Sequence, residues 1–541
     1  MADVRSENEE SQSLYGALST PRNFDEGIES SDVRLTSSLF DAYESEIFAS
    51  RPDIFQIVEE IGNKTFYEYS KSHIRENRNP SIKQRKKELH EAMYEEIWPL
   101  LGTKIARSVV RQLKDNDSVS TIQHSVPLGH PYILSAVFQN ATPYMGEIAP
   151  HLQNVIVLAN SLASFNNYSF PRADLLHLLT NKSLDSLQLS FFGQTKEASP
   201  TIFQEPFGDS EIQEIKKRIM QQRQAGKLNK EEGNKILRVV DEVYSNPHVL
   251  SQSNYLDQLT ILNYNLFKYY TKGYSKQIPN LVFLSQELIT LRLLKQNHMN
   301  METVLGNLMF NEDFHKLFLK EFDGLNGAFS IEHDKGTFLF WAYPKGAKHR
   351  ERLRLTDGIL KSVESDYEVA LTPEEVNKAI LNNELIPSTS LVFIVLAFYY
   401  GLFLGGGVAQ VKNLEALKKA YMSLLDQAKM LEEVSIVENL NVGNLLISRP
   451  TFLFMKWGKE RVPLTGMDIV TYGEKMNWDE VMKATRSVKM REVLARSYPF
   501  YYSQFTKKKE EVYESINESD IENYKELDLI IPALFSVSKD S

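Results

Sequence analysis

The chain contains no cysteine, and this absence removes several kinds of chemistry at once. Disulfides, iron–sulfur clusters, cysteine-ligated zinc and thiol nucleophiles are all excluded. The chain also lacks the Gly-Lys-Ser or Gly-Lys-Thr of a P-loop and the Gly-x-Gly-x-x-Gly of a dinucleotide site. Neither Gly-x-Ser-x-Gly nor His-Glu-x-x-His occurs, so the common signatures of serine hydrolases and zinc proteases are missing as well.

Positive charge is in deficit, with 61 Lys and Arg against 71 Asp and Glu and a net charge of −10. A general nucleic-acid or anionic-membrane binder needs a basic face to neutralise phosphates, so neither partner is expected. The N-terminal residues are acidic and polar and lack the apolar core of a signal peptide, which favours a cytoplasmic location. Residues 1–35 show no apolar periodicity and are predicted to form a disordered acidic tail.

The length of 541 residues exceeds what a single hydrophobic core usually serves. Beyond the tail we predict three segments. Residues 36–250 carry helices and an α/β unit with the candidate site, and residues 251–440 carry helices, a basic β-hairpin and a central buried helix. Residues 441–541 carry a second hairpin and C-terminal helices. The predicted fold class is α+β and helix-rich, with a small βαβ unit embedded in helical segments and β-hairpins in the C-terminal half.

The most apolar run of the chain, residues 385–411, contains no charged residue. Its core, Leu391–Leu404, is shorter than the roughly 20 residues that a bilayer needs. Tyr399 and Tyr400 lie in the middle of this core, whereas an aromatic belt would lie at its ends. We therefore predict a buried helix over the core, with a membrane span as the alternative.

Shorter apolar patterns predict further elements. The Leu-rich spacing of Leu281–Leu294 predicts a helix, and Leu187–Phe192 and Pro200–Phe207 resemble strands. Residues 337–358 and 451–466 each run from an aromatic strand through a basic, glycine-containing turn to a return strand, which is typical of a β-hairpin. Their residues Arg352 and Arg461 are candidate contacts for an anionic ligand, and solvated loop tips are the alternative.

The stretch from Ser118 to Arg172 carries the candidate site. Thr121–Gln123 and Val155–Leu158 are predicted to be parallel strands joined by a helix over residues 132–145, which forms a right-handed βαβ unit. In such a unit the loops after both strands leave the same edge of the sheet. This carboxyl edge is where open α/β sheets bind their ligands.

The two loops bring a dense set of polar side chains to that edge. The first loop contributes His124 and His130, and the second contributes Asn160, Asn166, Asn167, Ser169 and Arg172. Histidines can exchange protons near neutral pH, and Ser169 is a candidate nucleophile if a histidine reaches it. The asparagines suit recognition of hydroxyl or amide groups, and the arginine suits a carboxylate or phosphate.

A divalent metal is the rival use of the histidines. His124, His130 and Glu147 would form a two-His-one-carboxylate set, with His151, Asp174 and His177 as further candidate ligands. No recognised spacing supports this set. In a third interpretation the histidines only cap helices or bond buried backbone groups, and Arg172 only pairs with Asp174.

These features predict a cytoplasmic enzyme, a transferase or a hydrolase, that acts on a small metabolite bearing a carboxylate or phosphate. A metal-dependent enzyme is one alternative, and a non-catalytic scaffold for protein partners is another. No particular cofactor is indicated beyond the candidate metal, and the oligomeric state does not follow from the sequence.

Overall fold

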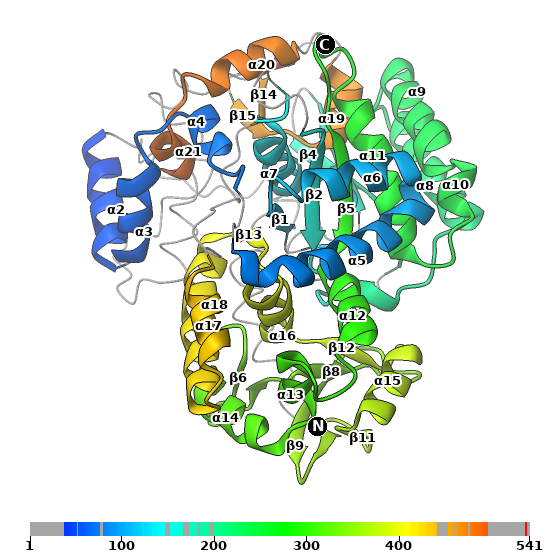
Figure 1. Cartoon of the computed structure of the whole chain (residues 1–541). Coiled ribbons are helices and arrows are strands. Elements are labelled where there is room, and N and C mark those ends of the chain that lie inside the picture. Colours follow the sequence, from blue (N-terminus) through cyan, green and yellow to red (C-terminus); the bar gives the residue numbers. More distant parts are fainter. Residues whose placement is uncertain are drawn as a thin grey trace.

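The computed structural model in Figure 1 describes most of the chain as an ordered, helix-rich α+β fold, as predicted. The residues described are 37–50, 52–75, 79–122, 124–145, 152–165, 173–180, 184–193, 199–440, 453–458, 460–473, 477–495 and 536–537. The predicted tail, residues 1–35, therefore lies outside the described residues.

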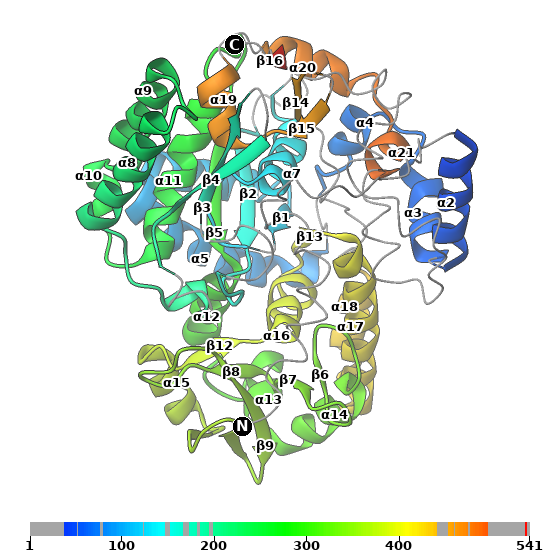
Figure 2. The same cartoon turned by 180° about the vertical axis from the view of Figure 1, so that it is seen from behind.

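A four-stranded parallel sheet forms the centre of the molecule (Figures 1 and 2). Its order is β13 (Phe403–Gly405), β1 (Ser118–Ile122), β2 (Asn154–Ala159) and β5 (Asn280–Ser285). Strand β1 pairs with β2, with Ser120 opposite Val157, and α7 (Pro131–Ala141) connects the two strands. The predicted βαβ unit is thus confirmed.

The two other strands of this sheet come from runs that were predicted to be helical. Within Leu281–Leu294, the first residues form β5, and α12 (Gln286–Asn297) begins directly after it. The predicted buried helix over 391–404 is wrong in its extent. The chain forms α16 (Thr389–Phe393) and a π-helix, η5 (Ile394–Tyr399), before it becomes strand β13. A short apolar run satisfies a buried strand and a buried helix equally well, so periodicity did not separate them.

Of the two other predicted short strands, one is present and the other is not. Residues 187–190 lie in β4 (Leu184–Ser190), which pairs with β3 (Ala173–Leu179) as an antiparallel hairpin. The predicted strand over Pro200–Phe207 is wrong, because this segment holds only a 3-10 turn, η3 (Thr201–Phe203). Among the described residues, no helix is both long and apolar enough to cross a membrane.

Helices pack on the sheet and extend to both sides of it. Helix α6 (Thr103–Gln112) lies against β2, α7 against β1 and β2, and α11 (Tyr255–Tyr270) against β5. Figures 1 and 2 show two outer helical groups on opposite sides of the molecule. The groups are α8 (Asp209–Gln224), α9 (Lys230–Val239), η4 (Val240–Tyr244) and α10 (Pro247–Leu250) on one side, and α2 (Ser37–Ser50) and α3 (Pro52–Ile61) on the other.

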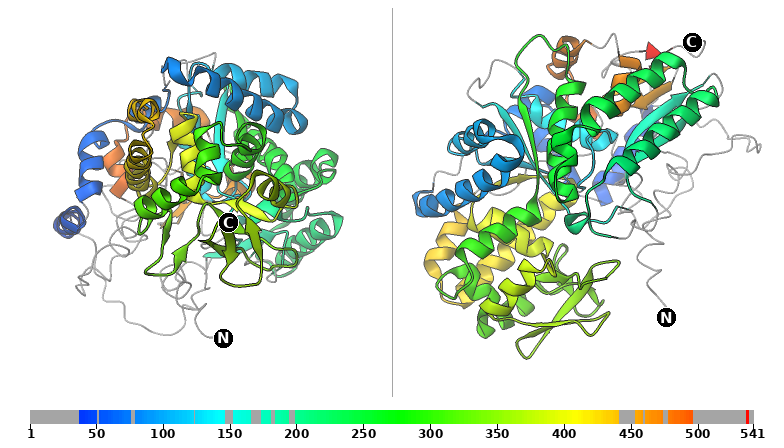
Figure 3. Two further views of the ribbon diagram at one scale, coloured as in Figure 1. Left: turned by 60° about the horizontal axis from the view of Figure 1, so that its bottom comes forward. Right: turned by 90° about the vertical axis from the view of Figure 1, so that its right-hand side faces the viewer.

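A second part of the molecule, at the bottom of Figures 1 and 2 and turned forward in the left view of Figure 3, holds the first predicted hairpin. Its antiparallel sheet has the order β11 (Glu368–Ala370), β10 (Ile359–Ser362), β9 (Glu351–Thr356), β8 (Phe340–Ala342) and β12 (Leu385–Pro387). Around it lie β6 (Phe329–Ser330), β7 (Lys335–Gly336), α13 (Val304–Phe310), α14 (Glu312–Phe322), α15 (Pro373–Leu381), α17 (Val408–Gln427) and α18 (Leu431–Glu438). The β8–β9 pairing confirms the hairpin prediction for this segment.

The second predicted hairpin is also present, and it lies at the opposite end of the molecule in Figures 1 and 2. Strands β14 (Phe454–Trp457) and β15 (Glu460–Pro463) pair antiparallel, and β16 (Ser536–Val537) joins them. The neighbouring elements are α4 (Phe66–Lys71), α19 (Gly466–Tyr472), α20 (Trp478–Thr485) and α21 (Met490–Ala495). The two basic hairpins therefore do not lie side by side.

Helix α5 (Lys83–Leu101, preceded by η1, Pro80–Ile82) joins the two parts through polar side chains that project from it. Arg85 donates to Glu433 at 2.5 Å, and its guanidinium lies 3.9 Å from the Tyr399 ring centroid. One helical turn after Arg85, Glu88 Oε2 accepts a hydrogen bond from the Tyr400 hydroxyl at 3.1 Å. The same hydroxyl lies 2.8 Å from His298 Nε2. Burial lowers the pKa of His298 to about 4, so its ring is neutral at pH 7.

Replacing Tyr400→Phe tests this junction. The change leaves the buried His298 without the hydroxyl at its Nε2, and we expect a loss of about 1–3 kcal/mol in the free energy of unfolding. Urea unfolding at pH 7 measures it, and Tyr264→Phe, which alters an exposed hydroxyl bonded to Lys268, should change stability by less than about 0.5 kcal/mol. Equal stabilities of the two variants would contradict the assignment.

Candidate functional site

The carboxyl edge of the parallel sheet has the topology of a ligand site. Because its four strands are parallel, the loops that follow β1, β2, β5 and β13 all leave this edge. After β1 the chain turns into α7, which packs on β1 and β2. After β13 it enters α17, which packs against α14 and α18 instead. Neighbouring strands whose loops diverge in this way define the switch point at which open α/β sheets bind ligands.

The loop after β1, residues 124–130, is anchored in the core. Asn263 of α11, fully buried, accepts from the Leu128 amide at 2.8 Å and donates to the Val126 carbonyl at 3.1 Å. At the end of the loop, the Gly466 amide at the start of α19 donates to the Gly129 carbonyl at 2.9 Å. The loop is therefore held from two sides, and its backbone is a fixed platform.

Both predicted histidines lie on this loop. Burial lowers the pKa of His124 to about 4, so the ring is neutral at pH 7, with one nitrogen as a hydrogen-bond donor and the other as an acceptor. His130 occupies the N-cap position of α7, ahead of Pro131, and its side chain makes no capping hydrogen bond. A neutral imidazole is not an acid at pH 7, so a proton donor at this edge would have to be another group.

Asp174, at the start of β3, is the strongest candidate for that other group. Its side chain is fully buried, and the Tyr244 hydroxyl donates to its Oδ2. The carboxyl group lies so close to Gly129 that a Cβ at position 129 would be only 1.5 Å from Oδ1. Burial raises the pKa of Asp174 to about 7, against the opposing effect of the Gly129 amide. A carboxyl group that titrates near neutral pH is suited to proton transfer.

Tyrosines surround the Asp174 carboxyl group. Tyr255 and Tyr270, both on α11 and both buried, interact with it electrostatically, and its charge adds to the burial that raises their pKa values. Tyr270 fits there because residue 466 is glycine: a Cβ at Gly466 would be 2.4 Å from the Tyr270 Cζ. Gly129 thus leaves space for the Asp174 carboxyl group, and Gly466 leaves space for the Tyr270 ring.

Sequence reasoning had considered Asp174 only as a metal ligand or as a partner of Arg172. The available signal was a lone acid in the apolar strand Ala173–Leu179, because an acid at such a position is buried. The strand pattern does not reveal which groups surround Asp174, because Tyr244, Tyr255 and Tyr270 come from η4 and α11.

The residues proposed as metal ligands have other partners or lie outside the described residues. His177 Nδ1 is 2.7 Å from Asp468 Oδ2, and the His177 amide donates to Asp468 Oδ1 at 2.9 Å. Glu147 and His151 are outside the described residues. Where the structure is described, no three His, Asp or Glu side chains converge in a way that could hold a metal ion.

The loop after β2 is attached to the end of β5 and the first turn of α12. The Ser161 amide and hydroxyl both donate to Glu287 Oε2, at 2.8 and 2.7 Å, and Ser285 Oγ lies 3.3 Å from the same oxygen. Asn160 accepts from the Ala163 amide at 3.1 Å, so its side chain helps to form the turn. The other predicted residues of this loop, Asn166, Asn167, Ser169 and Arg172, lie outside the described residues.

The two predicted hairpin arginines have structural partners. Arg352 bonds Asp334 at 2.8 Å and Glu364 at 2.6 Å, and Arg461 is buried over the Phe454 ring with 4.9 Å to its centroid. Their charges are therefore compensated or enclosed within the hairpins.

The tip of the β8–β9 hairpin, by contrast, reaches the carboxyl edge. Arg350 donates to the Leu162 carbonyl of the loop after β2 at 2.5 Å and lies 4.4 Å from the Trp341 ring centroid. Ser199 Oγ donates to the Lys348 carbonyl at 3.2 Å, while the Lys348 side chain is exposed, as is that of Lys345. The tip thus places basic side chains beside the loop after β2.

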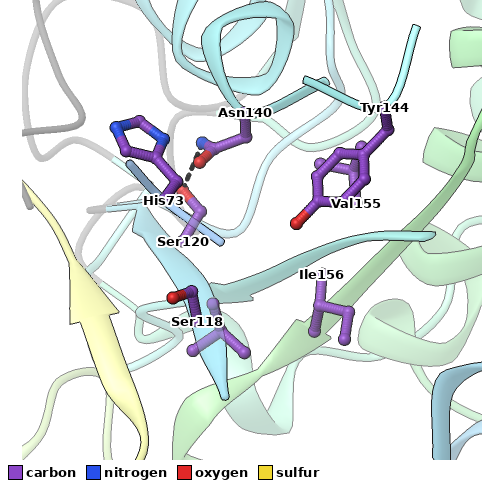
Figure 4. A pocket seen from close by; sticks show the side chains of 8 residues that line it. His73, Ser118, Ser120, Asn140, Tyr144, Val155 and Ile156 are labelled. Atoms are coloured by element: carbon purple, nitrogen blue, oxygen red, sulfur yellow. Dashed lines mark hydrogen bonds between the residues drawn. The ribbon is translucent and has the colours of Figure 1, made fainter. Parts of the chain in front are cut away.

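A small cavity lies on the face of β1 that α7 covers (Figure 4). Its lining residues are His73, Ser118, Val119, Ser120, Asn140, Tyr144, Val155 and Ile156. The cavity has room for about one water molecule, so it is too small for a metabolite.

Comparison with known proteins adds no relative: no protein-family model matches the chain, and no similar sequence was found among the curated proteins.

Asp174→Asn tests the buried carboxyl group through stability. Because folding raises its pKa from 3.8 to about 7, its stabilising contribution is complete below pH 3.8 and is lost as the pH rises through 7. The variant cannot ionise there, so its stability relative to the unmodified protein should improve from pH 4 to pH 8, by at most about 4 kcal/mol. Urea unfolding across this range is the measurement.

Asp366→Asn, at an exposed position, is the matched control and should show no such trend. A difference between the Asp174 variant and the unmodified protein that does not vary with pH would show that this carboxyl group is ionised throughout.

Proposed function

We propose that the chain is an enzyme, a transferase or a hydrolase, that acts on a small anionic metabolite at the carboxyl edge of the parallel sheet. The observation that carries this proposal is the position of Asp174. Its buried carboxyl group lies against Gly129 of the loop after β1, which leaves the switch point of the sheet. Burying a carboxyl group costs free energy, and groups whose pKa is strongly shifted by burial are concentrated at functional sites.

The roles follow from the surroundings of each group. Asp174 exchanges a proton with the substrate, since it has a titration range near neutral pH and a phenol, Tyr244, that keeps it oriented. His124, neutral on the same loop, accepts a hydrogen bond from the substrate. The absence of a thiol and of a dinucleotide motif favours transfer or hydrolysis over redox chemistry.

Recognition of the anion is assigned to basic side chains at two places. Lys345 and Lys348 lie on the tip that Arg350 attaches to the loop after β2. Arg172 precedes Asp174 by two residues in the sequence and offers a planar set of donors. These basic side chains are the proposed partners of a phosphate or carboxylate on the substrate, and a cytoplasmic location would supply such metabolites.

Thermal-shift screening against a library of phosphorylated and carboxylated metabolites tests the proposal. A metabolite that raises the melting temperature is then assayed for turnover. Asp174→Asn should lower kcat by about 10²–10⁴-fold, as expected for loss of an acid–base group, and Arg172→Ala should mainly raise KM. The exposed His333→Ala, at a loop position, is the control for His124→Ala.

Binding and turnover that survive both His124→Ala and Arg172→Ala would refute this site. Elemental analysis of the purified protein separates the metal-dependent alternative: one equivalent of bound metal, lost in a His124→Ala/His130→Ala variant, would replace proton transfer by metal chemistry.

A further inference from the structure

The cavity of Figure 4 brings together polar groups of β1, α7 and the turns that follow α4 and α7, inside an otherwise apolar layer. Ser118 and Ser120 are two residues apart on β1, so they face α7 from the same side of the strand. Asn140 of α7 donates to Ser120 Oγ at 2.8 Å, which secures the helix to the strand. In Figure 4, His73 lies beside Asn140, and Tyr144 directs its hydroxyl into the space from the opposite wall.

Several of these polar atoms lack a well-formed hydrogen bond within the described part of the protein. His73 is 3% exposed, and its ring interacts with the Asn140 side chain without a hydrogen bond of good geometry to either nitrogen. Ser118 is 8% exposed, and its hydroxyl has no hydrogen-bond partner there. The Tyr144 oxygen accepts from Asn116 Nδ2 at 2.9 Å, which leaves its proton to be donated elsewhere. Buried polar groups of this kind cost about 1–3 kcal/mol each when nothing bonds them.

We propose that this cavity is a binding site for one ordered water molecule, a site independent of the proposed function. A water molecule matches the volume, and its two donors and two acceptors match the lining. It accepts from the Tyr144 hydroxyl and bonds Ser118 Oγ and a nitrogen of the neutral His73. Burial, aided by the charge of Arg75, lowers the pKa of His73 to about 3, so the ring offers one acceptor and one donor.

Other occupants fit less well. A metabolite exceeds the space, and a metal ion would need further ligands, because no cluster of three His, Asp or Glu side chains occurs among the described residues. The bound water would connect His73, beyond the end of α4, to β1 and α7. It would thereby complete a polar joint between the N-terminal helices and the central sheet.

Oxygen-17 magnetic relaxation dispersion, which counts long-lived buried waters, tests this site. Ser118→Val removes a partner and fills the cavity, and it should lower the count by one relative to the unmodified protein. Ser245→Ala, which alters another buried and unpartnered serine hydroxyl outside the cavity, should leave the count unchanged.

Two further measurements keep the test decisive if Ser118→Val does not fold. A high-resolution crystal structure of the unmodified protein should show a single water within 3.2 Å of Ser118 Oγ and Tyr144 OH, and Ser118→Ala should shorten the residence time of that water. An equal count in the two serine variants, density larger than one water, or a side chain in the cavity would each overturn the proposal.

Discussion

The pairing of β1 with β13 is the constraint on which the rest of the structure depends. It pairs residues that are 285 positions apart, such as Ser118 and Phe403, and the Thr121 hydroxyl on β1 donates to the Gly405 carbonyl at 2.8 Å. Closing so long a loop has an entropic cost that rises only slowly with its length, so burial of a few apolar strands can offset it. Once β13 is in place, β1 has a neighbour on each side. Its loop then emerges in the middle of the carboxyl edge, where α11 and α19 enclose it.

The buried acids near that edge differ in the groups that surround their carboxyl groups. Glu287 receives the amide and hydroxyl of Ser161, and Asp468 receives the amides of Thr465 and His177. Asp174 receives the Tyr244 hydroxyl, lies close enough to the Gly129 amide to be affected by it, and has two further phenols nearby. Donors stabilise the ionised form of a carboxyl group, whereas burial favours the protonated form. At Asp174 the effect of burial is the larger one, and it raises the pKa to about 7.

What the sequence could predict follows from how local each signal is. The βαβ unit was predictable because two short apolar strands flank a helix of the right length, and the edge that carries His124 and Asn160 followed from that topology. Strands β5 and β13 were not predictable, because an apolar run such as 391–404 forms a strand or a helix depending on segments that are distant in sequence. The same applies to the site: Asp174 is special through Tyr244, Tyr255 and Tyr270, while Arg352 is occupied by Asp334 and Glu364.

The two halves of the candidate site are attached to the rest of the molecule by different kinds of contact. On one side, Asn263, Gly466 and Tyr244 fix the loop after β1 and Asp174 within the core. On the side of the anion, the hairpin tip is attached to neighbouring loops by the hydrogen bonds of Arg350 and Lys348. Segments with few buried contacts open at low free-energy cost, whereas core segments open only with global unfolding. In the proposed site, the core would therefore preorganise the acid, and the hydrogen bonds of Arg350 and Lys348 would position the basic tip beside it.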